Sequence, residues 1–390
     1  MPAAFILHCQ HHDGMTTVVE RVEAIPVAAS LEDPFGYAQG WVSERTATLV
    51  RVEASDGTVG WGECWGPHAG TCETIREFLA PRLIGTPPDR VERIHERLRE
   101  DARAAYQSVV PLPALSGVDI ALWDLKGKRV GASIATLLGG ARREAVRPYA
   151  TGHYFRHDAT IEEQYESITR EAMDNLERME AVKLKIGFGM LGHDAATDIE
   201  LVERVVEADP DATIMVDANY AYDIPTARRV GHALESFDVA WFEEPVHPEQ
   251  LAGYEHLRSV LDIPVAGGEC HTPWEFRQLF DRGGLDVAQP DLCNVGGLTA
   301  AKRIADRARA EGLAVYPHVW GTPVALGAAL QLLATLPGDP WLEFDTSPNP
   351  LRSELTTSPL VASDGTVSVP GGPGIGITID EDAVARYRVD

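Results

Sequence analysis

The sequence contains few cysteines for its length. Its five cysteines are an odd number without close-paired spacing, in a chain of 390 residues that is large enough to fold without disulfides. We therefore expect reduced thiols and a cytoplasmic location.

Basic residues are also scarce. Lysine and arginine number 34 against 59 aspartate and glutamate residues, which gives a formal net charge of −25. This charge repels nucleic acid and anionic membrane surfaces, so neither is an expected partner. The acidic residues are spread along the chain, which is typical of the solvated surface of a halophilic protein.

Long apolar runs are missing. No segment reaches the roughly 18 apolar residues of a membrane span, and the opening MPAAFILHCQHHDG is too acidic for a secretory signal. His8, His11 and His12 lie in this opening segment and could bind a metal, but such a cluster in an unanchored tail usually binds nothing in particular. We interpret residues 1–15 as an N-terminal extension outside the site.

Residues 16–145 predict an α+β domain. Up to about Glu63, alternating segments such as ATLVRVEAS and TVGWGE flank an SDG turn, which indicates an antiparallel hairpin sheet. Between residues 71 and 130, apolar side chains recur at helical spacing, and Gly131 is placed to end the last helix.

Residues 146–352 predict a closed α/β barrel. Short apolar runs alternate there with amphipathic stretches, and eight parallel βαβ strands are typical of a TIM-type barrel. The predicted strands are VRPYAT (146–151), AVKLKI (181–186), TIMVD (213–217), VAWFE (239–243), IPVAGGE (263–269), LDVAQPD (285–291), LAVYPH (313–318) and PWLEF (340–344). Residues 353–390 break this rhythm, and we expect them to return to the first domain.

Charged side chains or histidine end predicted strands 2 to 8, at separations of 22 to 32 residues. One βα unit has about that length, so these side chains should surround the rim where barrel enzymes keep their active sites. Any one acidic residue could lie there by chance, but ionised groups beside a barrel core are costly unless paired or bound to an ion. The residues are Lys185, Asp217, Glu243, Glu269, Asp291, His318 and Glu343.

Asp217, Glu243 and Glu269 predict a metal site, because they end neighbouring strands and offer only oxygen ligands. Such ligands suit Mg²⁺ better than zinc. In the WFEEP segment, strand alternation lets only one glutamate point inward, and we choose Glu243 over Glu244.

Lys183 and Lys185 lie two residues apart and should both face the barrel mouth. Two close like charges disfavour protonation, so we predict that Lys183 lowers the pKa of Lys185 and that Lys185 acts as a base.

Across the rim, Asp291 can orient His318 as a second acid or base. Glu343, if kept protonated, could donate a hydrogen bond to a substrate oxygen. Asn219 could also contact substrate, although a turn role is the alternative.

These parts suit one reaction. A carbon acid beside a carboxylate is weak, and its conjugate base is a doubly charged enolate; a metal that binds the carboxylate stabilises that charge, and lysine or histidine takes the proton.

The motifs KLKIGFG, VDANYAY, WFEEP, GGE, QPD and PHVWG, followed by Glu343, resemble the mandelate racemase subgroup of the enolase superfamily, from about Thr16 onward. The resemblance implies a modified (β/α)7β barrel capped by the N-terminal domain and the C-terminal tail, with Mg²⁺ as cofactor. It also implies that the lysine and the His–Asp dyad face opposite sides of the substrate. VAQPDLC and EFDTSPNPLR resemble the acid-sugar members.

We therefore expect Mg²⁺-dependent removal of the proton alpha to a carboxylate, on a sugar acid or its lactone, giving dehydration or cycloisomerisation. A racemase or epimerase and a non-catalytic carboxylate-binding protein are the alternatives. Cap loops at 31–45 and 64–71 should select the substrate, with Tyr37, Trp41, Trp65 and His68 as contacts. The expected partners are a small-molecule carboxylate and, in a homo-oligomer, further copies of the chain.

Overall fold

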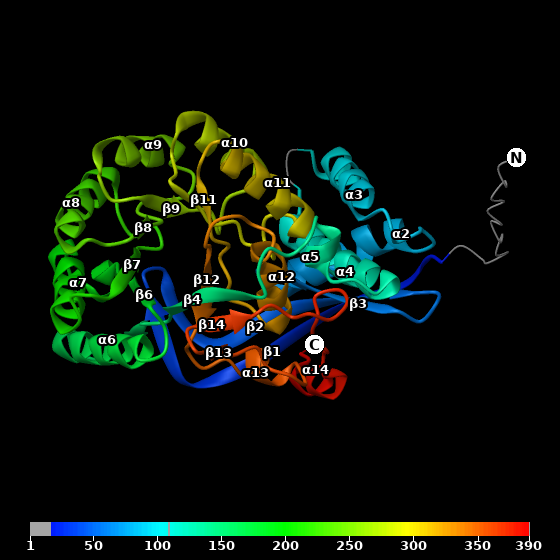
Figure 1. Ribbon diagram of the computed structural model, residues 1–390, viewed down its shortest axis with the longest axis horizontal. Helices are drawn as coiled ribbons and strands as arrows, with labels where there is room; N and C mark the ends of the chain where they lie inside the picture. The colour runs from blue at the N-terminus through cyan, green and yellow to red at the C-terminus, as the bar shows by residue number, and fades with distance from the viewer. Residues whose placement is uncertain (1–16, 108–109, 390) are drawn as a thin grey trace, which may run out of the picture.

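The computed structural model describes residues 17–107 and 110–389. The predicted N-terminal extension and its three histidines lie outside the described residues. Figure 1 shows a ring of helices around short strands on one side and a sheet with its own helices on the other. In the described part of the chain, no helix has the length and apolar character to cross a membrane.

The barrel has eight parallel strands, and each overlaps one of the predicted segments, which confirms the predicted fold class. Ladder hydrogen bonds join neighbouring strands from β11 back through β10, β9, β8, β7 and β6 to β4, and β12 pairs with the other edge of β4. The strands are β4 (Ala145–Thr151), β6 (Ala181–Lys185), β7 (Thr213–Asp217), β8 (Phe242–Glu243), β9 (Val265–Gly267), β10 (Val287–Ala288), β11 (Ala314–Val315) and β12 (Trp341–Asp345).

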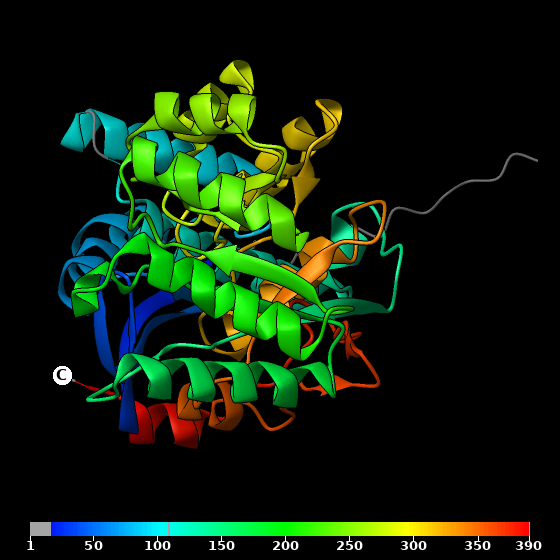
Figure 2. The ribbon, with the colours of Figure 1, turned by 90° about the vertical axis from the view of Figure 1, so that its left-hand side faces the viewer.

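One barrel helix follows each of the first seven strands, which gives the (β/α)7β order. Their apolar faces are buried against the strands, and Figure 2 shows several of them stacked side by side around the barrel. The helices are α6 (Ile161–Leu176), α7 (Ala195–Ala208), α8 (Ile224–Leu234), α9 (Leu251–Val260), α10 (Pro273–Arg282), α11 (Gly297–Ala310) and α12 (Pro323–Leu333). Short 3₁₀ turns, η2 (Phe188–Leu191) and η3 (Glu235–Phe237), extend two of the connections.

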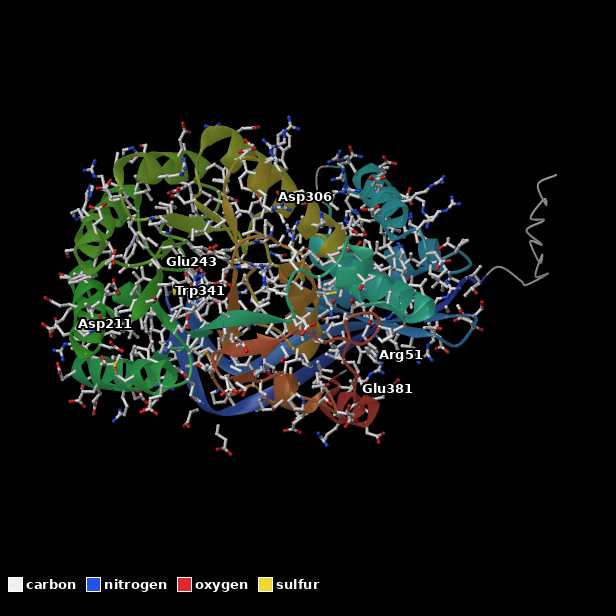
Figure 3. The ribbon with its side chains drawn as sticks, in the orientation of Figure 1. Arg51, Asp211, Glu243, Asp306, Trp341 and Glu381 are labelled. Atoms are coloured by element: carbon white, nitrogen blue, oxygen red, sulfur yellow. The ribbon has the colours of Figure 1, made fainter. Side chains whose placement is uncertain are left out.

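The barrel interior is filled, below the rim, by a separate apolar cluster that includes Tyr149, Met215, Trp241 and Trp341. Met215 and Trp241 lie two residues before Asp217 and Glu243, so strand alternation places each apolar residue on the same inward face as the carboxylate that follows it. Figure 3 shows Glu243 and Trp341 within the ring of helices, whereas Asp211 lies at its outer side. The charged side chains of the rim therefore lie directly above a packed apolar core inside the barrel.

The cap contains a four-stranded antiparallel sheet. Its strands are β1 (Val19–Tyr37), β2 (Gly40–Ala54) and β3 (Val59–Cys64), and β5 (Phe155–Arg156), from the barrel part of the chain, pairs with the end of β1. Its helices are α1 (His68–Glu73), η1 (Thr74–Leu79, a π-helix), α2 (Ala80–Leu83), α3 (Val91–Tyr106), α4 (Leu112–Val130) and α5 (Ile134–Leu137). Gly131 ends α4 in a left-handed conformation, φ 69°, as predicted.

The segment 31–45, predicted as a cap loop, is instead the end of the β1–β2 hairpin. The pairing Ser30 to Glu44 resumes as Phe35 to Val42, so extra residues of β1 bulge out around Pro34. Proline cannot donate to a strand ladder and is tolerated at such a bulge. The acidic residues and proline of LEDPFGY therefore concealed a strand from pattern analysis.

The C-terminal segment contacts both parts of the molecule. It contains α13 (Pro350–Glu354), β13 (Ala362–Ser363), β14 (Thr366–Ser368) and α14 (Glu381–Tyr387). β14 pairs with the start of β4, whereas beyond it the N–H of Val389 donates to the carbonyl of Pro26 in β1 at 3.0 Å. The tail thus ties the first barrel strand to the cap sheet.

Cap side chains also hold the start of barrel helix α12. The buried Glu63 carboxylate of β3 accepts hydrogen bonds from the N–H of Thr322 (3.0 Å), its hydroxyl (2.6 Å) and the N–H of Ala325 (3.0 Å). These amides are free donors at a helix start, where a carboxylate is stabilising. The cap is therefore fixed at the strand ends where the predicted site lies.

Candidate active site

Asp217, Glu243 and Glu269 converge at the rim. One carboxylate oxygen from each lies within 4.8 Å of the other two, and Asp217 and Glu243 are fully buried. Glu269 Oε2 lies 3.1 Å from His318 Nε2 in an ion pair, and it accepts no hydrogen bond from the described residues. Burial raises the pKa of Glu243 to about 7, although Lys183 opposes the rise. Three carboxylate oxygens this close together form a donor set that fits a divalent cation.

The Glu243 carboxylate is oriented by two neighbours that sequence reasoning missed. Gln289 Nε2 donates to Glu243 Oε2 at 2.7 Å, and the Trp241 indole N–H donates to the same oxygen at 3.0 Å. A signal was available, because Gln289 lies two residues before Asp291, and Trp241 two before Glu243, on inward-facing positions of the strands predicted from the sequence.

Glu244 is the alternative to Glu243 as a ligand. It is buried with a backbone φ of 43°, and in the described part of the chain neither of its carboxylate oxygens has a hydrogen-bond partner. Glu244, Glu269 and Cys270 form a second group whose ligand atoms lie within 4.8 Å of one another. Burial raises the pKa of Glu244 well above its ordinary value, and Glu269 adds to the rise. The choice of Glu243 as ligand therefore stays a prediction.

Both lysines face the barrel interior, as expected from their spacing. Lys183 Nζ lies 2.6 Å from Glu243 Oε1 and 2.7 Å from Glu343 Oε1, and Lys185 Nζ lies 2.5 Å from Asp217 Oδ2. The prediction of a lowered lysine pKa is wrong for this structure. Burial lowers the pKa of Lys185, and the positive charge of Lys183 lowers it as well. The adjacent Asp217 carboxylate outweighs both effects, so the pKa of Lys185 is raised.

His318 and Asp291 form the predicted dyad. His318 Nδ1 lies 2.6 Å from Asp291 Oδ2, and the N–H of Cys293 fixes the other carboxylate oxygen at 2.6 Å. Burial lowers the pKa of His318, but the carboxylates of Glu269, Glu343 and Asp291 outweigh it and raise the pKa to about 10. An imidazole held through Nδ1 presents Nε2 to the rim.

Glu343 differs from its prediction. The predicted donor role requires a protonated carboxyl. Burial raises the pKa of Glu343, but Lys183 and His318 outweigh burial and lower the pKa to about 2. Glu343 is therefore ionised, and it accepts a hydrogen bond from the N–H of Val319 at 3.1 Å. An ionised carboxylate between two cationic side chains stabilises their positive charges, and it has no proton with which to donate a hydrogen bond to substrate.

A cavity between cap and barrel opens onto this rim. Its lining includes both candidate bases, one metal ligand and several aromatic rings, so a substrate in it would meet Lys185 and His318 together. The lining residues are Phe35, Tyr37, Val42, Trp65, Tyr154, Lys185, Asn219, Glu269, His318 and Trp320. Among these, Trp65 packs edge-on against the His318 ring, with centroids 5.6 Å apart.

Two of the predicted substrate contacts lie elsewhere. Trp41 is 39% exposed and packs against His157, and His68 Nδ1 is 2.8 Å from the hydroxyl of Thr48 in the cap sheet. Neither lines the cavity, whereas the predicted Tyr37, Trp65 and Asn219 do. Phe35 and Val42 were missed because the hairpin was read as a loop.

Comparison with known proteins identifies the family. Residues 20–139 match the N-terminal domain model of mandelate racemase and muconate lactonizing enzyme, and residues 167–383 match the enolase C-terminal domain-like model. The chain belongs to the mandelate racemase and muconate lactonizing enzyme family of the enolase superfamily. It is therefore a lyase or isomerase of the enolase superfamily, and members of that superfamily use Mg²⁺. Both points agree with the resemblance of its motifs.

Relatives in this family act on acid sugars. The chain is 41% identical to D-galactarolactone cycloisomerase of Agrobacterium fabrum over 369 residues, which cover 92% of this chain and 96% of that protein. It is 30% identical to arabinonate dehydratase of Saccharolobus solfataricus, with 87% and 90% covered. The crystal structure of 3,6-anhydro-D-galactonate cycloisomerase from Zobellia galactanivorans superposes with a TM-score of 0.85 at 34% identity, covering 96% of this chain and 100% of that one.

Proposed function

We propose that this enzyme removes the proton alpha to the carboxylate of a sugar acid or its lactone and completes either a cycloisomerisation or a dehydration. One observation carries the proposal: Lys185 and His318 line the same cavity, together with Glu269 of the acidic cluster. Proton removal and departure of a β-oxygen need a base and an acid at one substrate. Lys185 ends β6 and His318 follows β11, so the two side chains reach the cavity from separate βα units.

Asp217, Glu243 and Glu269 would hold the metal, which we propose to be Mg²⁺. When bound, the ion supplies positive charge beside the substrate carboxylate as the α-proton leaves. The proposal rests on the mutual approach of the three carboxylates.

Lys185 and His318 would share the proton transfers. Because the neighbouring carboxylates raise both pKa values, one of the two must first lose its own proton before it takes the α-proton, and the other gives its proton to the departing oxygen. Asp291 orients His318, since its bond to Nδ1 directs Nε2 toward the cavity side. Lys183 and Glu343 act as positioning residues, because each contacts other rim side chains and neither lines the cavity.

Cap residues would select the substrate. Tyr37 and Trp65 line the cavity from the cap, and Asn219 lines it from the barrel. Aromatic faces suit the C–H faces of a sugar, and the amide of Asn219 can bind a hydroxyl.

The test is turnover of aldonates, aldarates and their lactones by the Mg²⁺-loaded enzyme. We expect one of them to be converted to an isomer or a dehydrated product, and Lys185→Ala and His318→Asn to abolish that conversion. Turnover equal to wild type in either variant would refute the assignment.

An epimerase is the second candidate, because two bases that line one cavity could also act on opposite faces of a carbon. In D₂O, an epimerase would place deuterium in both epimers without net elimination. Loss of water or ring isomerisation, with no epimer formed, would exclude it.

Three further predictions rest on composition or on sequence resemblance alone: a homo-oligomeric state, a cytoplasmic location and adaptation to high salt. Greater stability in low salt than in molar salt would contradict the last of these.

A further inference from the structure

A second cavity lies away from the rim, between α3 of the cap and α10 and α11 of the barrel. It has a volume of about 660 Å³, its open mouth included. Buried apolar side chains, including Phe276, Phe280 and Ile304, line part of it. It shares no lining residue with the cavity at the active site.

The polar part of this lining is basic. Four arginines line the cavity, Arg99, Arg277, Arg303 and Arg307, and among the described residues no acidic side chain does. This is unusual in a chain with a net charge of −25. Arginines gathered at one cavity favour oxyanions, which the guanidinium fork binds through paired hydrogen bonds.

Two of the four arginines, Arg99 and Arg277, retain capacity to bind a ligand. The other two are already paired, Arg303 with Glu96 at 2.7 Å and Arg307 with Asp281 at 2.5 Å. Arg277, by contrast, lies 3.8 Å from an Asp281 oxygen, and Arg99 has no acidic partner within ion-pair distance in residues 17–107 and 110–389.

His95 provides an independent sign of a ligand. The residue is 3% exposed and lines the cavity, and its Nε2 lies 2.9 Å from the carbonyl of Gly296. A carbonyl only accepts, so Nε2 carries the hydrogen and Nδ1 of the neutral ring is an acceptor. Nδ1 is buried with no hydrogen-bond partner within the described chain, which is costly unless something donates to it. Burial, together with Arg303, lowers the pKa of His95 to about 4, which keeps the ring neutral at pH 7.

We propose that this cavity is a binding site for a small hydroxylated organic anion, whose phosphate or carboxylate group lies among the arginines while one hydroxyl donates to His95 Nδ1. The apolar side chains receive the carbon skeleton. The site is separate from the proposed reaction and does not depend on it.

The experiment is calorimetric titration of the Mg²⁺-loaded enzyme at low ionic strength. Glucose 6-phosphate and glucuronate are the probes, and they distinguish phosphate from carboxylate. Inorganic phosphate tests the oxyanion alone, and glucose tests the hydroxyls alone. We expect saturable binding of at least one of the two sugar anions, weaker binding of inorganic phosphate and no binding of glucose.

Matched variants locate the binding. Arg99→Gln should weaken it about tenfold, because a charge-assisted contact is lost. Arg93→Gln removes the same charge from an exposed position of α3 outside the cavity and should leave the affinity unchanged. His95→Gln should reduce the preference for a sugar anion over inorganic phosphate. An unchanged melting temperature of each variant checks its fold.

Several results would overturn the proposal. One is the absence of saturable binding of either sugar anion, and another is equal loss of affinity in Arg93→Gln and Arg99→Gln. A loss in Lys185→Ala but not in Arg99→Gln would place the anion at the rim. A change of oligomeric mass in Arg99→Gln without anion binding would mean that a second copy fills the cavity.

Discussion

Asp119 in cap helix α4 accepts two hydrogen bonds from Thr299 in the first turn of barrel helix α11, at 2.9 Å from the backbone N–H and 2.7 Å from the hydroxyl. The N-cap residue of α11 is Gly296, which has no side chain to cap the helix itself. A Cβ at Gly297, where φ is 84°, would lie 2.4 Å from an Asp119 oxygen, so the glycine permits this approach. The cap domain thus supplies an N-cap to the barrel.

Removing this carboxylate should destabilise the protein. Asp119→Ala leaves a buried amide and hydroxyl without their acceptor, and we expect the free energy of unfolding to fall by about 2 kcal/mol. Urea denaturation measures it. Glu100→Ala, at an exposed position of α3, is the control and should change stability by less than about 0.5 kcal/mol. Equal midpoints for the two variants would contradict the role of Asp119.

The same carboxylate should make stability depend on pH. Burial raises the pKa of Asp119 to about 7, although the hydrogen bonds from Thr299 oppose the rise. The native state then binds more protons than the unfolded chain between about pH 4 and 7, so the contribution of Asp119 to stability falls as pH rises through that window. The side chain introduced in the variant Asp119→Asn cannot ionise, so the variant should not show this decrease in the free energy of unfolding between about pH 4 and 7. Parallel stability curves for wild type and variant across the window would disprove it.

Metal binding should be visible as stabilisation. A ligand that binds only the native state at about 100 times its Kd adds about 2.7 kcal/mol, so Mg²⁺ added after chelation should raise the melting temperature. Asp217→Asn, Glu243→Gln and Glu269→Gln should each lose most of this increase. Glu207→Gln, exposed on α7, is the matched control. If Glu244→Gln loses the increase and Glu243→Gln keeps it, the ligand has been assigned to the wrong residue of the pair.

The proposed acid and base should govern the rate more than substrate binding. Lys185→Ala and His318→Asn should lower kcat by about 100-fold or more, and Asp291→Asn should lower it less, because the histidine is retained but no longer fixed. The exposed His256→Asn is the control for loss of an imidazole. Steady-state kinetics on the substrate found by the turnover test decides this.

The corrected placement of the aromatic contacts gives a further prediction. Trp65→Ala should raise KM, because Trp65 lines the cavity beside His318. Trp41→Ala removes the same side chain from a site that packs on His157, and should leave KM unchanged. A raised KM in Trp41→Ala alone would mean that the hairpin rearranges when substrate binds.

Sequence alone predicted the barrel and the rim because both depend on periodicity. Strand alternation and the regular βα length suffice to bring Asp217 and Glu243 side by side and to place His318 against Asp291. Protonation states were less accessible, since the pKa values of Lys185 and Glu343 depend on which opposite charge lies within a few ångströms of each.

Contacts between the two domains were the part that could not be predicted. Glu63 and Thr322 are 259 residues apart, and no pattern in either segment indicates the other. The same holds for the Pro34 bulge, which conceals the strand that brings Phe35 and Tyr37 to the cavity.

That strand has a consequence for how this enzyme family can diversify. Phe35 and Tyr37 occupy alternate positions of one β-ribbon and both line the cavity. A ribbon held by backbone pairing tolerates exchange of alternate side chains, but a single inserted residue reverses which face each one presents. Selection for a new substrate on this side should therefore act through substitutions two residues apart rather than through changes of loop length.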